Sequence, residues 1–279
     1  MTTLFLAALM GLASKHDEPI SHTPAVYWFP ASEGIEKWLP RLADEELFDT
    51  WIADPKPNPA TLEAAKGKVH FVSPSTAYTT ANMKWRDATL KLVRGEISPA
   101  AWLNGTNGLG ETLHYLTTPK TPNLRSLTAK IENGLGSYSG RAVFGETLIC
   151  YLPGKPCFYS TDLFLTNYFP QDSQYESWIL AMNDYVGPML SLRVDYPKLC
   201  TQKPKILRAD NIPGMLIFTQ KIGPKTFTFY FNNGLKPLAL PKAFHTQSAI
   251  MPRGLDLDTP AGPFLLGSGT ALTIDPPDK

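Results

Sequence analysis

Cysteine is scarce in this sequence. The chain has 279 residues but only three cysteines, Cys150, Cys157 and Cys200, and none of them forms a CxxC pair. Three thiols cannot all pair within one chain, so neither a disulfide framework nor a cysteine-rich zinc site is indicated. The five histidines are scattered, and no spacing between them places two imidazoles on one face. We therefore expect buried, unreactive thiols and structural histidines, with no metal site and no cofactor.

An excess of charge of one sign is also missing. The 26 Lys and Arg residues nearly balance the 25 Asp and Glu residues, and the formal net charge is +1. The densest basic stretch, residues 198–208, is interrupted by Pro204 and by apolar residues, which is typical of a solvated loop. Neutralisation of a phosphate backbone requires a continuous basic stripe, so we expect no nucleic-acid partner.

The apolar N-terminal segment Thr2–Ala13 is too short to cross a bilayer, which takes about 20 helical residues. It is similar to the apolar region of a signal peptide, but no Lys or Arg precedes it. We expect it to stay on the chain as a packed or interface-seeking helix within an N-terminal extension of residues 1–24. Peripheral membrane contact through residues 2–13 and an uncleaved targeting segment are the alternatives. The compartment stays open, and an organellar or membrane-associated complex is compatible with the sequence.

Apolar residues, at 43% of the chain, are sufficient for the core of one large or two medium domains. Short aromatic and β-branched runs alternate with helical patterns, which is typical of a parallel sheet or part of a barrel. One helix is marked by a cap at Thr79 or Thr80 and a stop at Gly95. Strands are expected at 25–29, 68–73, 126–132 and 155–159, and helices at 81–92, at 140–151 and from Pro40 to Trp51.

The pattern changes near residue 206. Met215–Gln220 and Thr226–Asn232 are rich in β-formers and flank a turn at Gly223-Pro224. We therefore expect an antiparallel β-domain at residues 201–279, after an α/β domain at residues 25–200. The predicted fold class is α/β: a partial or degenerate (β/α) barrel followed by a small antiparallel β-sandwich.

The segment Gly140–Asp162 resembles the last barrel unit of the α-amylase superfamily. A helix runs into Leu152-Pro153-Gly154-Lys155-Pro156, and an aromatic strand and an acidic residue follow. Downstream, Met189–Leu199 is similar to the helix that leaves the family's barrel, and Gly214–Pro241 is similar to the first strands of its C-terminal sandwich. The resemblance implies the barrel fold of glycoside hydrolases that act on α-glucosidic bonds.

The catalytic acids of that family are absent where the resemblance places them. The family uses a nucleophilic Asp, a general-acid Glu and a second Asp, and two carboxylates are the minimum for this chemistry. Its Glu-Asn-His-Asp motif aligns with Glu132, Asn133, Gly134 and Leu135, so Gly and Leu replace the His and the Asp. Arg141 and Asp162 are the other retained motif positions.

The other two acids are also missing from the aligned strands. Lys68–Ser73, aligned with the general-acid strand, runs into Pro74 without a Glu. Ala25–Phe29, taken as the fourth barrel strand, runs into Pro30 without an Asp before Glu33. No catalytic residue is therefore assigned.

The barrel is also expected to be incomplete. Without the β-domain about 200 residues remain, whereas eight βα units need about 250. If Ala25–Phe29 is the fourth strand, the first half of the barrel is missing. An open parallel edge must then be covered by a partner chain, by the N-terminal segment, or by a shorter sheet.

These observations favour a non-catalytic structural or assembly subunit of a larger complex, with other protein subunits as partners. Hydrolysis of an α-glucan with non-standard acids is one alternative, using Glu132, Glu146 or Asp162. Carbohydrate binding is the other, through aromatic residues able to stack on sugar faces: Trp28, Trp38, Trp51, Tyr138 and Tyr159.

Overall fold

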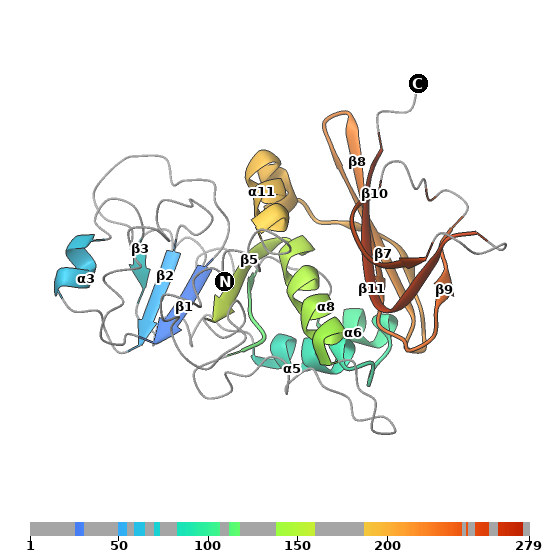
Figure 1. The fold of residues 1–279 in the computed structure, drawn as a ribbon, viewed down its shortest axis with the longest axis horizontal. Coiled ribbons are helices and arrows are strands. Elements are labelled where there is room, and N and C mark those ends of the chain that lie inside the picture. Colours follow the sequence, from blue (N-terminus) through green and yellow to red (C-terminus); the bar gives the residue numbers. More distant parts are fainter. Residues whose placement is uncertain are drawn as a thin grey trace. The chain divides into compact units, whose positions relative to one another are not determined.

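The structure is a computed structural model, and it describes residues 26–30, 50–54, 59–64, 70–72, 83–106, 112–117, 138–159, 187–241, 244, 249–256 and 262–275 (Figure 1). The chain divides into two compact units. Unit 1 comprises residues 1–82, 111–123 and 154–197, and unit 2 comprises residues 83–110, 124–153 and 198–279. Each unit is therefore assembled from three separate stretches of chain. The division into residues 1–24, 25–200 and 201–279 stays a prediction.

Unit 1 contains a parallel sheet of five strands in the order β3-β2-β1-β5-β4. Three of its strands overlap the predicted ones, and residues 126–132 lie outside the described part of the chain. The described helices of this unit are α3 (Pro59–Ala64) and α11 (Gly187–Asp195). The strands are β1 (Val26–Pro30), β2 (Thr50–Asp54), β3 (His70–Val72), β4 (Thr112–His114) and β5 (Gly154–Tyr159).

Strand β2 corrects the predicted helix from Pro40 to Trp51. Trp51 lies in this strand and pairs with Tyr27 of β1 on one side and with Phe71 of β3 on the other. The apolar spacing of Leu47, Phe48 and Trp51 suits a helix, but a short apolar run does not separate helix from strand by its period. Pairing with β1 and β3 on both sides makes this segment a strand. Residues 40–49 of the predicted helix lie outside the described residues.

Helix α11 is tied to the sheet of unit 1 by a buried arginine. Arg193 is 1% exposed, and its guanidinium donates a hydrogen bond to the carbonyl of Gly154, the first residue of β5. Met189, Leu190 and Leu192 of the same helix are buried. A buried charge needs hydrogen-bonding partners, so this contact fixes where the helix lies on the strand.

The described helices of unit 2 are α5 (Met83–Val93), α6 (Pro99–Gly105), α8 (Tyr138–Tyr151) and the 3-10 helix η3 (Pro197–Cys200), which begins at the boundary of the unit. The start of α6 is capped, because the Ser98 hydroxyl accepts a hydrogen bond from Ala101 N–H and Pro99 occupies the first turn. The indole N–H of Trp102 donates to Thr89 Oγ1 at 3.0 Å, and its ring meets Trp85 edge to face. These contacts join α5 and α6 into one layer.

The sheet of unit 2 is antiparallel and has six strands. Its order is β10-β11-β8-β7-β6, and β9 pairs with β11. The predicted hairpin is confirmed, since β7 and β8 pair from Met215 with Asn232 to Ile222 with Lys225 around Gly223, whose φ is 58°. The strands are β6 (Lys205–Ala209), β7 (Met215–Ile222), β8 (Lys225–Asn232), β9 (Leu238–Ala239), β10 (Ala249–Asp256) and β11 (Phe264–Asp275).

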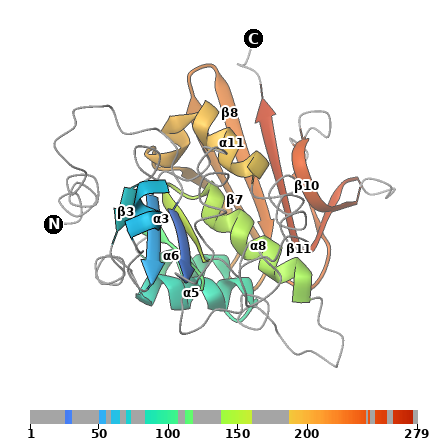
Figure 2. The same ribbon diagram turned by 60° about the vertical axis from the view of Figure 1, so that its left-hand side comes forward.

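Both faces of this sheet are buried where β7 and β8 pair through 215–218 and 229–231, and these two runs are apolar without interruption. On one face Phe231 stacks on Phe218 and meets Phe144 of α8 edge to face. Helix α8 lies along this face in both ribbon views (Figures 1 and 2). The residues between them along each strand point to the opposite face of the sheet, as expected for a pleated strand. Strands buried on both sides lose the apolar-polar alternation of a half-exposed sheet.

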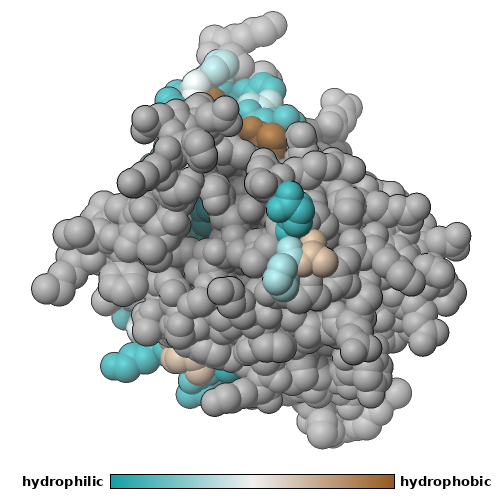
Figure 3. All heavy atoms as spheres, turned by 90° about the vertical axis from the view of Figure 1, so that its left-hand side faces the viewer, coloured by the Kyte–Doolittle hydropathy of each residue, from teal (hydrophilic) through white to brown (hydrophobic). Residues whose placement is uncertain are grey.

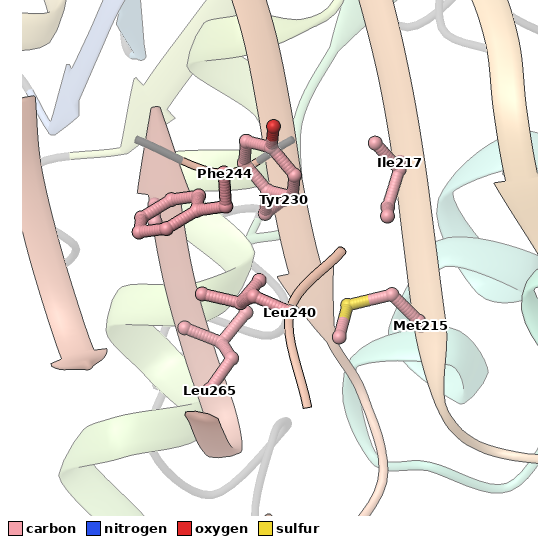
Figure 4. Packing of buried hydrophobic residues seen from close by; sticks show 7 residues of the cluster. Met215, Ile217, Tyr230, Leu240, Phe244 and Leu265 are labelled. Carbon is pink, nitrogen blue, oxygen red and sulfur yellow. The ribbon is translucent and has the colours of Figure 1, made fainter. Parts of the chain in front are cut away.

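The second face carries its own core, in which Tyr230 and Phe244 meet edge to face (Figure 4). Met215, Ile217, Leu240, Leu265 and Ala271 complete this cluster. The described strands thus form one curled sheet, and the predicted two-sheet sandwich is corrected. The register shifts between β10 and β11 mark bulges, and bulges bend a strand so that one sheet encloses a core on its inner side.

Candidate functional site

The candidate site of unit 1 is the carboxyl edge of its parallel sheet. Ligands of open α/β sheets and of barrels bind at the carboxyl ends of the strands, because loops from several strands meet there. In the described part of this sheet, β1, β2, β3 and β5 end at Pro30, Asp54, Val72 and Tyr159. On the face drawn in Figure 3 the described residues are mostly hydrophilic, with a few scattered hydrophobic ones.

Asp54 is the single acidic residue among the ends of the described parallel strands. It pairs with Pro30, so both stand at the same level of the sheet. Tyr159 pairs with Trp28, two residues earlier on β1. Sequence reasoning missed Asp54 because its strand was taken for a helix and a loop. The signal was there in Thr50-Trp51-Ile52, a β-prone run that stops before Pro55.

Glycoside hydrolysis uses two carboxylates, and Asp54 is the one that stands at an end of the described parallel strands. Four of the predicted motif positions, Glu132, Asn133, Gly134 and Leu135, lie outside the described residues, and so does Asp162. Their roles stay predictions. Glu146, the remaining acidic candidate, is a buried residue of helix α8 in unit 2.

His114 lies at the end of β4, but register places it deep in the sheet. It pairs with Pro156, one residue before Cys157, and Cys157 pairs with Val26, the first residue of β1. Its imidazole is fully buried, at 0% exposure. His114 therefore lies at the amino-terminal level of β1, far from the carboxyl edge, and we assign it a structural role.

Arg141, the described member of the predicted motif, lies in the helical layer of unit 2. Its side chain is buried, and Nη1 donates a hydrogen bond of 2.7 Å to the carbonyl of Val93, the last residue of α5. The last carbonyls of a helix have no partner within the helix, and a cation stabilises that end. In unit 2 this arginine thus supports the end of a helix.

The same helix end is closed by a Schellman motif. Gly95 N–H bonds to the Leu92 carbonyl and Glu96 N–H to the Lys91 carbonyl, both at 2.9 Å. Gly95 has a φ of 70°, and a Cβ added there would lie 2.8 Å from the Asn233 carbonyl oxygen. The stop predicted at Gly95 is therefore confirmed, and the glycine is required by both conformation and space.

Asn233, which follows β8, connects the helices of unit 2 to its sheet. Its Nδ2 donates to the carbonyls of Leu92 and Ile97, each at 2.9 Å. Its Oδ1 accepts from Gly214 N–H at 2.7 Å. The side chain is 2% exposed, and these bonds use both its donors and its acceptor. No sequence pattern identified this residue, because its partners, Leu92 on α5 and Ile97 between α5 and α6, are 141 and 136 positions away.

All three cysteines lie within the described residues. Cys150 and Cys157 are buried, Cys200 is partly exposed, and none of the three forms a disulfide. Within the described residues, no three His, Cys, Asp or Glu side chains are grouped as a metal ion would require. No described helix has the length and apolarity to span a membrane.

Comparison with known proteins finds similarity at the level of structure. Neither a protein-family model nor a curated protein matches the sequence. The native form of a debranching enzyme from Nostoc punctiforme aligns with a TM-score of 0.51 and 11% identity, covering 87% of this chain and 62% of that one. The ligand-free cyclic α-maltosyl-(1→6)-maltose hydrolase from Arthrobacter globiformis aligns with a TM-score of 0.51 and 16% identity, covering 88% and 60%.

The fold is similar to that of α-amylase family glycoside hydrolases. The resemblance drawn from Gly140–Asp162 is thereby confirmed for the fold. This chain spans 60–62% of the length of the two enzymes. Identities this low show a common fold and no more, because one fold serves many functions.

Proposed function

We propose that this chain is a non-catalytic structural or assembly subunit of a larger protein complex, built on part of an α-amylase-like fold. The observation that carries the proposal is the strand order of the parallel sheet. In a closed eight-stranded barrel the strands pair in chain order, and the last strand pairs with the first. Here the order is β3-β2-β1-β5-β4.

Strand β5 follows Leu152-Pro153-Gly154, which resembles the turn into the last barrel strand. If β5 holds the last place, then β4 beside it holds the place before the last. β1 on its other side holds the first place, and β2 and β3 hold the second and third. This order replaces the earlier assignment of Ala25–Phe29 to the fourth place.

The part of the barrel that has no described strand is then its middle. No described strand holds the fourth, fifth or sixth place, and the connection from β3 to β4 contains α5 and α6 of unit 2. The resemblance assigns the nucleophilic Asp to the fourth strand and the general-acid Glu to the next acid-bearing strand. The lack of a described strand at these places supports a chain without glycosidase activity, and Asp54 is the acidic residue among the described strand ends.

An incomplete barrel also supports a partner. Strands β3 and β4 are the edges of the described sheet, whereas a closed barrel has none. We expect a neighbouring subunit to cover this side of the sheet, because an open parallel edge exposes unpaired backbone groups and apolar side chains.

Native mass spectrometry of the protein, purified from its source without overexpression, tests this function. A stoichiometric complex supports the subunit, and a lone monomer contradicts it. A parallel incubation of the purified chain with α-1,4- and α-1,6-linked maltooligosaccharides should give no products. Asp195→Asn, outside the sheet, is the control. Turnover that is abolished by Asp54→Asn but retained in this control would support the alternative that the chain is a glycoside hydrolase.

Carbohydrate binding without hydrolysis is the second candidate. Two of the predicted stacking residues, Trp28 and Tyr159, are register partners on neighbouring strands near the carboxyl edge. Isothermal titration with maltoheptaose tests the idea. Tyr196→Ala, on the segment after α11, is the control. Binding that is lost in Tyr159→Ala but kept in this control would favour carbohydrate binding. A titration without any heat of binding would contradict it.

A further inference from the structure

Two turns and one strand segment of unit 2 meet at one end of its antiparallel sheet. They are residues 212–214 before β7, residues 234–236 after β8, and residues 266–267 in β11, and together we call them the turn platform. Their backbones are in direct contact. A Cβ on Gly267 would lie 2.6 Å from the Leu235 carbonyl oxygen, and a Cβ on Gly234 would lie 3.1 Å from that of Pro213. Glycine is required where backbones approach this closely.

Buried amides hold the turn platform rigid. Asn232, at 0% exposure, donates from Nδ2 to the carbonyls of Lys236, Leu265 and Leu266 at 2.8, 2.9 and 3.1 Å. Its Oδ1 accepts from Gly234 N–H at 3.0 Å. Asn233 holds Gly214 in the same way. Each of the three segments of the turn platform is therefore held in place by a hydrogen-bonded side chain that is itself buried.

This rigid framework presents aliphatic side chains to solvent. Ile212 is 71% exposed, Leu235 is 56% exposed and Leu266 is 40% exposed, so three of the six exposed large hydrophobic residues in the described part of the chain stand on adjoining backbone. Grouped exposed apolar side chains mark interaction surfaces, whereas single ones are ordinary. A backbone that is already fixed also loses little entropy on binding, which favours affinity.

The charge at the turn platform has one sign. Lys236 is exposed next to Leu235, and no described residue forms an ion pair with it. The nearby Arg208 and Asp210 neutralise each other through hydrogen bonds of 2.8 and 3.1 Å. A complementary surface therefore carries apolar groups and a carboxylate. A second copy placed around a twofold axis would bring Lys236 near its own counterpart, which argues against self-association.

We propose that the turn platform docks a different protein, through an aliphatic cluster on Ile212, Leu235 and Leu266 and a carboxylate of the partner opposite Lys236. This proposal rests on the proposed assembly function for the existence of a partner. It adds the surface and its chemistry, on the unit that does not contain the parallel sheet.

Photo-crosslinking in the source cells tests the proposal. The full chain carries p-benzoylphenylalanine in place of Leu235, and the matched control carries it in place of Leu207, which is 53% exposed on the edge strand β6. We expect position 235 to crosslink to a segment of another protein that contains aliphatic residues and an Asp or Glu, with position 207 giving at least about tenfold less product. Lys236→Glu should lower recovery of that partner at least about tenfold, and Lys236→Arg should keep it.

The outcomes separate the two proposals. A stoichiometric complex in native mass spectrometry without a crosslink from position 235 supports the assembly function and overturns the docking surface. A crosslink to a second copy, or recovery unchanged by Lys236→Glu, also overturns it. A lone monomer overturns both. Melting temperatures of the Lys236 variants within error of the wild type exclude unfolding as the cause, since the side chain is exposed.

Discussion

Replacement of Asn233 by alanine should loosen the helices of unit 2 from its sheet. The substitution removes three hydrogen bonds, two donated to the carbonyls of Leu92 and Ile97 and one accepted from Gly214 N–H. The Leu92 carbonyl keeps a partner, because Gly95 N–H also bonds to it. The Ile97 carbonyl and the Gly214 N–H lose the bonds that the side chain provided.

The expected cost follows from those two groups. A buried polar group left without its partner costs about 1–3 kcal/mol, so Asn233→Ala should lower the free energy of unfolding of unit 2 by about 2–5 kcal/mol. A domain is stable by about 5–15 kcal/mol in total, so the loss is large. Asn233→Asp retains the shape and the acceptor but turns the donor into an acceptor facing two carbonyls. It should be at least as destabilising as alanine.

Urea denaturation followed by circular dichroism measures the free energy, and hydrogen exchange of the amides of α5 and α6 locates the effect. Asn211→Ala, in the exposed turn beside Gly214, is the matched control and should change stability by less than about 0.5 kcal/mol. The reasoning is refuted if Asn233→Ala behaves like Asn211→Ala, or if exchange in α5 and α6 is unchanged. Tolerance of aspartate with loss on alanine would indicate a packing defect instead.

Three other substitutions test the same unit. Gly95→Ala should lower the free energy of unfolding, measured by urea denaturation, by about 1–3 kcal/mol, because Gly95 has a positive φ and lies close to the Asn233 carbonyl. Gly105→Ala, in a helix with open space around it, should be neutral or stabilising. Equal effects of the two substitutions would contradict this. Phe231→Ala should cost about 3–5 kcal/mol, since the ring packs on Phe144 and Phe218, and a loss below about 1 kcal/mol would show that this face is not a core. Burial raises the pKa of Asp210, but hydrogen bonds from Arg208 and Met215 N–H and the Arg208 charge outweigh it and leave that pKa below its usual value of 3.8. The stabilisation by ionised Asp210 is therefore present above that value and lost as pH falls through the pKa of the folded state. The melting temperatures of wild type and Asp210→Asn should converge as the solution is acidified. A difference in melting temperature that does not change with pH would contradict this.

Much of the local structure follows from the sequence because its signals are local. The stop at Gly95, the helix that leads into Leu152-Pro153-Gly154, and the hairpin around Gly223 each depend on residues a few positions apart. The resemblance of Gly140–Asp162 to α-amylase proteins also follows from one short segment, and the fold comparison agrees with it. Turn and cap chemistry acts within a few residues, so sequence reasoning reaches it.

What the sequence did not determine depends on pairing between distant segments. Strand β2 forms because β1 and β3 flank it, although the spacing of Leu47, Phe48 and Trp51 suits a helix equally well. The pairing of the strands in the order β3-β2-β1-β5-β4 places Asp54 at the carboxyl edge of the sheet and His114 in its interior. Asn233 donates hydrogen bonds to the carbonyls of Leu92, 141 positions away on α5, and of Ile97, 136 positions away in the segment after it. Periodicity reports which side of an element is apolar, whereas only the tertiary structure decides which element lies beside it and in what register.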